Sequence, residues 1–399
     1  MNPMSLDGVK VLDLSRILAG PTATQLLGDL GADIVKVERP GEGDDTRHWG
    51  PPYVTGKDGQ PTGESAYYLC ANRNKRSIAI DIAAPEGFTL VLRLLERADI
   101  LVENYKVGGL AKYGLAYAQL KERFPRLVYC SITGFGQTGP NAHRAGYDFL
   151  IQGMGGIMSL TGEPDGDPMK VGVGIADVMT GMFATVGILA ALRHRDATGV
   201  GQHIDISLLD AQIAWLVNAG TNYLMSRKKP SRLGNGHPNI VPYQVFDTAD
   251  SPMILAVGND GQFRRFCDST GLRELASDPL YATNLARVEN RERLCELIAR
   301  CLRSRRRAEW LAKFEGVGVP CGPVNDLEQV FADPHVQARG AELTLAYPGS
   351  ATGSVSLLAN PLKLSETPVS YRHAPPKLDE HREDVLADWL GSANRSNSE

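Results

Sequence analysis

Short apolar runs alternate with segments of helical periodicity in the N-terminal part of the chain. The apolar runs Val9–Ser15 and 33–39 predict buried strands, and residues 22–32 between them predict a helix. Further strands are predicted at Ser77–Ile82, Ala98–Tyr105 and Leu127–Gly136, and further helices at 84–98 and 117–125. Strands that alternate with helices are typical of a parallel sheet. The predicted fold class is therefore α/β, with a Rossmann-like order.

The pattern changes after residue 178. Apolar positions recur at helical spacing from 178 to 225, and we expect helix over most of 203–226 as well. Residues 227–244 then break the periodicity with Gly, Pro and Asn, which is typical of a linker or a functional loop. Residues 244–320 predict a second, smaller α/β unit.

Length and charge limit the classes of function. A chain of 399 residues exceeds one ordinary core, so two domains are expected. The formal net charge of -4 argues against nucleic-acid or anionic-membrane partners. We see no run of about 20 apolar residues and no secretory signal. The six scattered cysteines are typical of reduced thiols, so we expect a cytoplasmic protein.

Several common chemistries lack their motifs in this sequence. The first predicted strand is followed by "RILAGPTATQ", without the GxGxxG of dinucleotide enzymes, so NAD is not expected. The eight histidines show no metal-ligand spacing, so no metal is expected. Neither a GxSxG elbow nor a P-loop is present.

Basic residues follow several predicted strands. The carboxyl ends of parallel strands meet at one edge of the sheet, where open α/β sheets bind ligands. Cations gathered there would suit a polyanion such as a nucleotide diphosphate, although ordinary solvated loop charges would give the same pattern. The residues concerned are Arg39, Arg47, Arg73, Lys75, Arg76 and Lys112.

Two further stretches have candidate chemistry. Asp177 is the one acidic residue of "VGVGIADVMTG", and a carboxylate in apolar surroundings is costly unless it is paired. It is either the cap of a following helix or a reactive group. Gly234 and Gly236 flank Asn235, and such a backbone can stabilise an oxyanion or serve as a hinge. His237, which follows, is either structural or catalytic.

Motifs in order along nearly the whole chain resemble the family III CoA-transferases. They include "LDGVKVLDLSRILAGP", "LGDLGADIVKVERPGEGDDTR", "NRNKRSIAIDI", "ADILVENYKVGGLAKYG", "GVGIADVMTGMFATVGILAALRHR" and "GVPCGPVNDLEQVFADPHVQARG". The resemblance implies an interlocked homodimer, in which each chain is a ring threaded through the other. It also implies a large Rossmann-like domain at 1–224 and 330–399 and a small domain at 225–329.

The resemblance further implies a mechanism. Asp177 matches the family's nucleophile, which attacks an acyl-CoA thioester and passes through an anhydride and an aspartyl-CoA thioester. Gly234, Asn235 and Gly236 resemble the mobile glycine loop that shields these intermediates from water. The positions matching CoA contacts are Arg16, Ile17, Ala19, Arg39, Arg73, Lys75, Asn104, Tyr105, Lys112 and Tyr113.

Other motifs look closest to succinyl-CoA:glutarate CoA-transferases and their itaconate- or citramalate-using relatives. The second carboxylate of such acids needs a cationic or polar partner. Candidate substrate residues are Arg47, Arg144, Tyr147, His237 and Gln244.

Three alternatives stay open. One is transfer to another acid, such as formate, oxalate or carnitine. The second is an α-methylacyl-CoA racemase, although those enzymes carry a Gly-His-Asp motif where this chain has Tyr147. The third is a non-enzymatic CoA-binding protein.

The chain differs from the family pattern at two positions. Lys112 stands where formyl-CoA transferase carries Arg. Asp379 stands where relatives commonly show Gly, in what we interpret as a surface turn.

Overall fold

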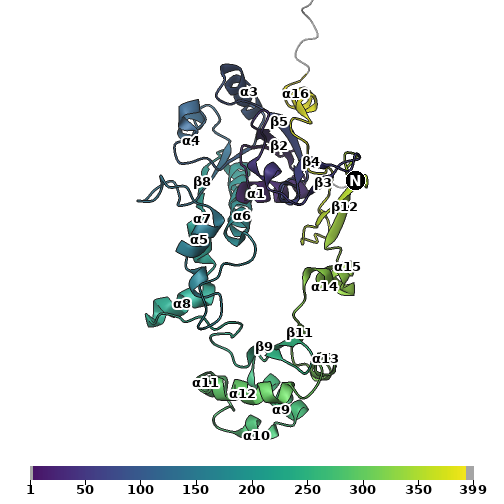
Figure 1. The fold of residues 1–399 in the computed structure, drawn as a ribbon. Coiled ribbons are helices and arrows are strands. Elements are labelled where there is room, and N and C mark those ends of the chain that lie inside the picture. Colours follow the sequence, from purple (N-terminus) through teal and green to yellow (C-terminus); the bar gives the residue numbers. More distant parts are fainter. Residues whose placement is uncertain (1–2, 392–399) are drawn as a thin grey trace, which may run out of the picture. The chain divides into compact units, whose positions relative to one another are not determined.

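The computed structural model describes residues 3–391 and divides the chain into two compact units (Figure 1). The larger unit combines three stretches, Met1–Gly156, Val171–Leu216 and His335–Glu399. The smaller unit combines Ile157–Lys170 with Val217–Pro334.

A six-stranded parallel sheet forms the centre of the larger unit. Numbered within the sheet, its strands have the order 3-2-1-4-5-6, which is the Rossmann order expected from the sequence. From edge to edge the strands are β5 (Lys75–Ala79), β2 (Asp33–Glu38), β1 (Lys10–Asp13), β6 (Ile100–Glu103), β7 (Val128–Thr133) and β8 (His203–Ser207).

Helix was expected over most of 203–226, and α7 and α8 confirm this, while the first five residues form β8. Ile204 and Ile206 of β8 pack partly buried against the core, and the strand completes the ladder beside β7. Ser207 then starts helix α7 (Leu208–Ala214), because its hydroxyl accepts the Asp210 N–H at 3.0 Å. Pairing with a distant strand decided the outcome, and helical periodicity within the segment did not reveal it.

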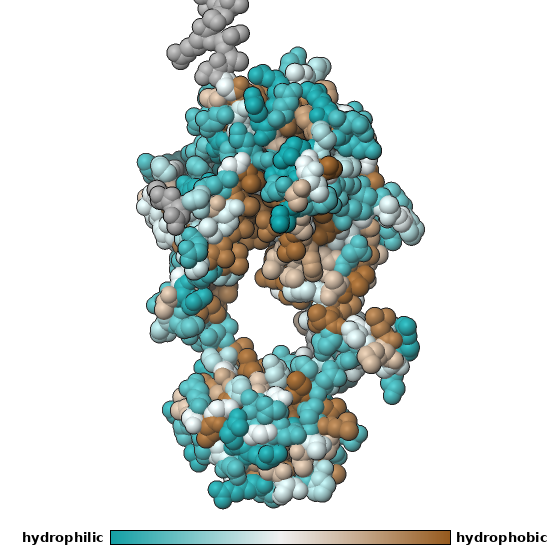
Figure 2. Space-filling view, turned by 180° about the vertical axis from the view of Figure 1, so that it is seen from behind, coloured by the Kyte–Doolittle hydropathy of each residue, from teal (hydrophilic) through white to brown (hydrophobic). Residues whose placement is uncertain are grey.

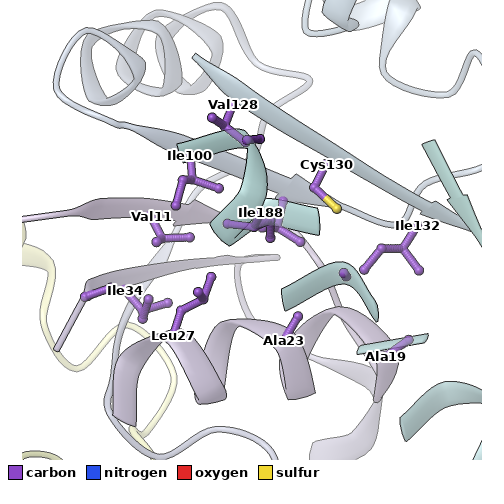
Figure 3. Close-up of a cluster of buried hydrophobic side chains, with 14 of the residues drawn as sticks. Val11, Ala19, Ala23, Leu27, Ile34, Ile100, Val128, Cys130, Ile132 and Ile188 are labelled. Atoms are coloured by element: carbon purple, nitrogen blue, oxygen red, sulfur yellow. The ribbon is translucent and has the colours of Figure 1, made fainter. Parts of the chain in front are cut away.

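Alternating side chains divide the sheet between two apolar layers. On one face Val11, Ile34, Ile100 and Val128 pack against α1 (Ala19–Asp29) and α6 (Ile175–Thr198), with Ala23, Leu27 and Ile188 between them (Figure 3). On the other face a second cluster packs beneath α3 (Pro85–Leu95) and α16 (Arg382–Leu390). Both faces are covered, as a parallel sheet requires.

Helix α6 is, within the described residues, the helix long and apolar enough by length and composition to cross a membrane. The sequence analysis had found no such run. Its buried positions, which include Ala184, Ile188 and Ala191, belong to the core of the larger unit. One face of α6 is therefore part of that core.

The remaining elements of the larger unit are short. They are η1 (Asp45–His48), β3 (Tyr53–Thr55), β4 (Pro61–Ser65), α2 (Ala66–Leu69), η2 (Ala111–Tyr113), α4 (Tyr117–Leu120), α5 (Asp148–Met154), β12 (Glu342–Ala346) and β13 (Ser354–Leu358), and α15 (Pro334–Ala338) begins at the boundary between the units. The turn at Asp379 has φ 60° and is fixed by the Ala79 N–H, which donates to the Asp379 carboxylate at 2.6 Å. Asp379 therefore occupies a left-handed position that suits Gly, in a turn against the edge strand β5.

The smaller unit is a three-stranded antiparallel sheet covered by helices. Its apolar core includes Phe246, Phe263, Phe266, Trp310 and Phe314. The strands are β11 (Cys321–Pro323), β10 (Pro252–Ala256) and β9 (Tyr243–Asp247). The helices are η3 (Ile157–Ser159), α8 (Val217–Ser226), α9 (Asp260–Thr270), α10 (Arg273–Ser277), α11 (Asn284–Glu289), α12 (Arg291–Leu302), α13 (Arg307–Glu315) and α14 (Leu327–Ala332).

The unit boundaries differ from the expected 224/225 and 329/330, and residues 157–170 join the smaller unit. Hydrogen bonds account for this addition. The Gly234 N–H donates to the Gly162 carbonyl at 3.1 Å, and the Arg232 guanidinium donates to the carbonyls of Glu163 and Gly166. These contacts join stretches far apart in sequence, so the linear pattern could not indicate them.

Candidate active site

A pocket of about 120 Å³ lies in the larger unit where β1 and β6 are neighbours. This is the point at which the strand order reverses, where open α/β sheets bind ligands. Its walls are the loops after β1, β6 and β7, the 142–147 segment and the first turn of α6. Eight expected site residues line it, namely Arg16, Ile17, Ala19, Asn104, Tyr105, Arg144, Tyr147 and Asp177.

A second pocket of about 700 Å³ lies over the carboxyl ends of β1, β2 and β5. Arg16 and Tyr105 line both pockets, so one extended ligand can contact both. Arg39 and Tyr113, both expected to contact CoA, line the second pocket, and Lys36 adds a cation to its wall. Its volume suits a nucleotide, and its cations Arg16, Arg39 and Lys36 are each paired with a carboxylate of the same wall, with which a phosphate would compete. In residues 3–391, no group of three or more His, Cys, Asp or Glu residues is arranged to hold a metal ion.

Asp177 lies in the first turn of α6, but it does not cap the helix. The N-cap position is Gly174, and the capping acceptor comes from Asp148, at the start of α5. The Asp148 carboxylate accepts the Ala176 N–H at 2.8 Å and the Asp177 N–H at 3.4 Å, and the Gln152 amide donates to it at 2.7 Å. Of the two interpretations of Asp177, the cap is therefore wrong, and its side chain is left for another role.

The Asp177 carboxyl is half-buried in the wall of the small pocket. Burial, together with the negative charge of Asp148, raises the pKa of Asp177 to about 7. No hydrogen bond from any described residue reaches its oxygens. A carboxylate with few partners in partly apolar surroundings is a stronger nucleophile than a solvated one.

Tyr67 of α2 is a residue that the sequence analysis missed. Burial and then the charge of Asp177 raise the pKa of Tyr67 to about 12, so the phenol lies close enough to that carboxylate to sense its charge. The Tyr67 ring meets Trp49 edge to face at 5.2 Å between centroids. Only its place in "SAYYLC", just before the basic "NRNKRS", pointed to this segment.

Arg144 and Tyr147 form the outer wall of the small pocket. The Arg144 guanidinium lies 5.0 Å from the centre of the Phe135 ring and donates to the Asn141 side chain at 3.3 Å. Tyr147 is 59% exposed. Among the described residues lining this pocket there is no histidine, which is the second base that a racemase of this type requires.

Three expected contact residues are buried in structural ion pairs instead. Arg73 holds Asp29 at 2.6 Å, Arg47 holds Glu38 at 2.7 Å, and Lys75 faces Asp13 at 3.3 Å. None of the three residues is more than 3% exposed, and none lines either pocket. The prediction that these three side chains contact CoA or substrate directly is therefore not supported by the structure. Buried cations of this kind are paired because an unpaired one would cost several kcal/mol.

Lys112 is exposed, lies over the Tyr113 ring at 4.5 Å and does not line the second pocket, although Tyr113 does. Its expected phosphate contact stays a prediction.

The glycine segment and two candidate substrate residues lie in the smaller unit. The Gly234–Gly236 turn is held by the Gly162 carbonyl at one end, and the Arg291 guanidinium donates to the His237 carbonyl at 2.7 Å at the other. Burial and the nearby Arg291 charge lower the pKa of His237. Gln244 lies in β9, where its side-chain oxygen accepts the Cys295 thiol. Both ends of the turn are thus anchored.

Comparisons with known proteins agree on one family. The family model described as CoA-transferase family III matches residues 6–382. The succinate–glutarate CoA-transferase of Agrobacterium fabrum is 52% identical over 384 residues, covering 96% of this chain and 95% of that protein. A succinyl-CoA:glutarate CoA-transferase of Homo sapiens is 42% identical over 395 residues, covering 99% and 88%. A crystal structure of a CaiB/BaiF family protein from Brucella suis superposes with a TM-score of 0.84 at 49% identity, covering 97% of this chain and all of that one.

Proposed function

Because the chain belongs to CoA-transferase family III, we propose that it transfers CoA from succinyl-CoA to a free dicarboxylic acid such as glutarate. The observation that carries this proposal is the Asp177 carboxyl, half-buried and without a hydrogen-bond donor among the described residues, in the pocket where the strand order reverses. The names of the similar proteins from Agrobacterium fabrum and Homo sapiens support the choice of donor and acceptor.

The two pockets divide the donor between them in this proposal. The nucleotide of succinyl-CoA takes the larger pocket, with Arg16 and Arg39 beside its phosphates. The thioester takes the smaller pocket, next to Asp177. Arg16 and Tyr105 line both spaces, so they would contact the segment that joins the two ends.

Transfer then proceeds by four displacements at acyl carbons. The Asp177 carboxylate attacks the succinyl carbonyl, and the CoA thiolate leaves to give a mixed anhydride. The thiolate attacks the Asp177 carbonyl, which releases succinate and forms an aspartyl-CoA thioester. The acceptor carboxylate displaces the thiolate again, giving a second anhydride. The thiolate finally attacks the acceptor acyl carbon, and Asp177 returns as a carboxylate.

The outer arginine has a proposed role in binding the acceptor acid. Arg144 would bind the distal carboxylate of the acid, because it lines the small pocket and has no carboxylate partner among the described residues.

We also propose a homodimer, which the family resemblance describes as interlocked. Figure 2 shows apolar surface on the larger unit. Its exposed apolar side chains include Phe149 of α5 and Met182, Phe183 and Val186 of α6. An apolar surface of this kind marks an interface. Light scattering of the purified protein should give twice the mass of one chain.

A mass-spectrometric transfer assay tests the proposed activity. Succinyl-CoA is mixed with glutarate, itaconate, citramalate, malate, oxalate or carnitine, one at a time. The expected result is a new glutaryl-CoA peak that Asp177→Asn lowers by at least about 10³-fold. Asp268→Asn, which alters an exposed ion pair, is the matched control and should keep full activity.

Other outcomes of this assay would redirect the proposal. A product with oxalate or carnitine alone would replace the dicarboxylate acceptor. Solvent deuterium at the α-carbon of a branched acyl-CoA would indicate racemase activity. Binding of CoA without any new ester would indicate a non-enzymatic protein.

A further inference from the structure

Ile17, in the loop between β1 and α1, has an unusual backbone conformation. Its φ is 73°, in the left-handed region that β-branched residues avoid. Holding such a residue there costs about 1–3 kcal/mol and persists only where the surroundings enforce it. Ile17 lines the small pocket beside Asp177, so the strain lies within the candidate active site.

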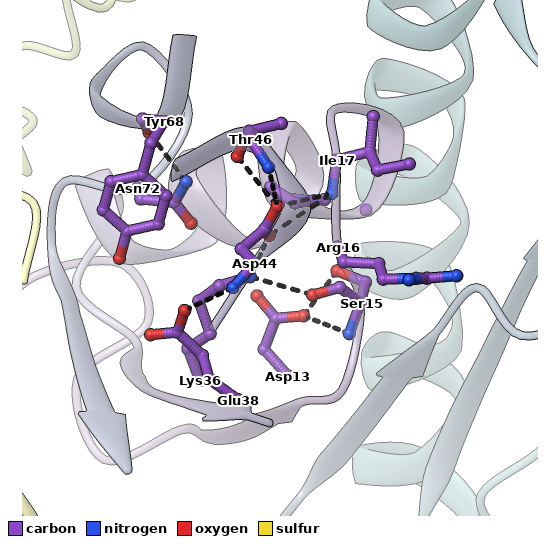
Figure 4. Close-up of polar contacts among 12 residues, drawn as sticks. Asp13, Ser15, Arg16, Ile17, Lys36, Glu38, Asp44, Thr46, Tyr68 and Asn72 are labelled. Atoms are coloured by element: carbon purple, nitrogen blue, oxygen red, sulfur yellow. Dashed lines mark hydrogen bonds and ion pairs between the residues drawn. The ribbon is translucent and has the colours of Figure 1, made fainter. Parts of the chain in front are cut away.

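The Asp44 carboxylate holds this conformation from the neighbouring loop. It accepts the Ile17 N–H at 3.2 and 3.3 Å, and it accepts the backbone N–H and hydroxyl of Thr46 at 3.0 and 2.8 Å (Figure 4). Asp44 is only 2% exposed. The Asn104 side chain also brackets Arg16, accepting its N–H at 3.0 Å and donating to its carbonyl at 2.7 Å.

Lys36 of β2 connects the two ends of this arrangement. Its ammonium donates to the Asp44 carboxylate at 2.8 Å and to the Ser15 carbonyl at 2.9 Å (Figure 4). Burial by itself would raise the pKa of Asp44, but the charge of Lys36 and its hydrogen bonds hold that pKa at about 2. The pair is therefore ionised at neutral pH, and one cation fixes the chain before Ile17 together with the carboxylate that holds Ile17.

We propose that Lys36 and Asp44 are positioning residues for CoA transfer, which hold Ile17 in its left-handed conformation so that Arg16 and Ile17 line the two pockets correctly. The inference rests on the proposed function, because it assumes that CoA binds along these pockets. The turn at Ile17 separates Arg16, which lines both pockets, from Ala19, which starts α1 and lines only the smaller one. A relaxed turn would redirect the Arg16 guanidinium and change the width of the small pocket.

The test uses Asp44→Asn, which keeps the size of the side chain and removes the ion pair. We expect the Kd for CoA, measured by calorimetry, and the KM for succinyl-CoA to rise at least about 10-fold, with little change in the KM for the acceptor acid. Thr46→Val is the matched control, because it removes another hydrogen bond to the same carboxylate without involving Ile17. It should lower the melting temperature and leave the Kd for CoA within about 2-fold.

A second substitution separates positioning from stability. Adding Ile17→Gly to Asp44→Asn should recover much of the lost CoA affinity, since Gly adopts this φ without strain. If Asp44→Asn does not fold, Ile17→Pro in the otherwise unchanged protein decides the question. Pro cannot adopt a positive φ, so the Kd for CoA should rise at least about 10-fold.

Unchanged CoA affinity in a folded Asp44→Asn variant, no recovery from Ile17→Gly, or wild-type affinity in Ile17→Pro would each overturn the proposal. A wild-type protein that binds CoA but transfers none of it would refute the proposed function alone. A wild-type protein that does not bind CoA would refute both.

Discussion

Asp177 and Asp148 are two carboxyl groups placed so that one helps to set the ionisation of the other. Asp148 is held by hydrogen bonds from the N-terminus of α6 and from Gln152, whereas Asp177 has burial and the Asp148 charge around it. The first carboxyl thus accepts several hydrogen bonds, and the second accepts none from the described residues. This difference favours Asp177 as the nucleophile, because a poorly stabilised carboxylate has less to lose on forming an anhydride.

The activity should depend on pH through Asp177. Only the carboxylate form attacks, and its pKa is about 7, so kcat/KM for succinyl-CoA should rise with pH and level off above that value. Asp148→Asn keeps an acceptor oxygen and removes the charge, so the midpoint should move to lower pH. A pH–rate profile from pH 5 to 9 measures both. A profile that is flat in wild type would contradict this assignment.

The ionised Asp177 carboxylate should also lower the free energy of unfolding. A carboxyl whose pKa is raised on folding binds more protons in the folded than in the unfolded state between about pH 4 and pH 7, so stability falls as pH rises through that range. Asp177→Asn removes this cost. It should raise the free energy of unfolding at pH 8 by about 1–3 kcal/mol, with little gain at pH 4. Thermal unfolding at pH 4 and at pH 8 measures this difference. An equal effect of Asp177→Asn at the two pH values would contradict the raised pKa.

Arg144 should determine the preference for dicarboxylic acids. Losing a charge-assisted hydrogen bond costs about 1.5–3 kcal/mol, so Arg144→Ala should raise the KM for glutarate about 10- to 100-fold. Turnover of pentanoate, which lacks the second carboxylate, should change little. Arg144→Lys, which keeps the charge, should lie in between. Equal losses for both acids would assign Arg144 a different role.

At the scale of elements, the crossing of α1 and α6 determines where Asp177 lies. A Cβ built on Gly181 would come 2.6 Å from the Ala19 carbonyl oxygen and 2.9 Å from the Thr22 Cβ. The two helices therefore approach closely one turn after Asp177, and this contact places the first turn of α6 against the loop that contains Ile17. A glycine that appeared to end a motif in the sequence is thus a packing residue.

Gly181→Ala should separate these helices. We expect a loss of about 1–3 kcal/mol of stability from overpacking, together with weaker CoA binding. Gly187→Ala in the same helix is the matched control, since its nearest foreign atom would be the Ile204 side chain at 3.4 Å. That substitution should instead stabilise the helix by about 0.5–1 kcal/mol. The melting temperatures of the two variants, compared side by side, decide this.

At the scale of the whole molecule, residues 360–390 complete the larger unit by bonding to its N-terminal part. The Asn74 side chain donates to the Ser370 carbonyl and accepts the N–H groups of Arg372 and His373. Arg73 and Asn360 both hold the buried Asp29, so the N-terminal sheet and the C-terminal segment share one polar network. The basic "NRNKRS" therefore serves the assembly of the unit more than its ligand.

Trp389 of α16 tests this closure. The ring is 2% exposed, and its N–H donates to Asp33 at 2.7 Å. Trp389→Ala should cost about 3–5 kcal/mol, whereas Trp389→Phe, which mainly loses the hydrogen bond, should cost about 1 kcal/mol. Chemical denaturation measures both. If Trp389→Ala were as stable as wild type, the C-terminal segment would not contribute to closing the unit.

The sequence by itself determined the parallel sheet, its Rossmann order and the ligand loops at one edge. These follow from local periodicity and from the rule that loops after parallel strands meet. The sequence also showed that Asp177 is the one acidic residue of an apolar stretch. Tertiary structure alone decided that β8 is a strand, that 157–170 joins the smaller unit and that Asp148, not Asp177, caps α6. It also decided which cations are buried: Arg47, Arg73 and Lys75 look like Arg16 and Arg39 in the sequence. All five cations have a carboxylate partner. The difference is that Arg47, Arg73 and Lys75 meet theirs in the interior, whereas Arg16 and Arg39 meet theirs at the surface, and no local pattern records that depth.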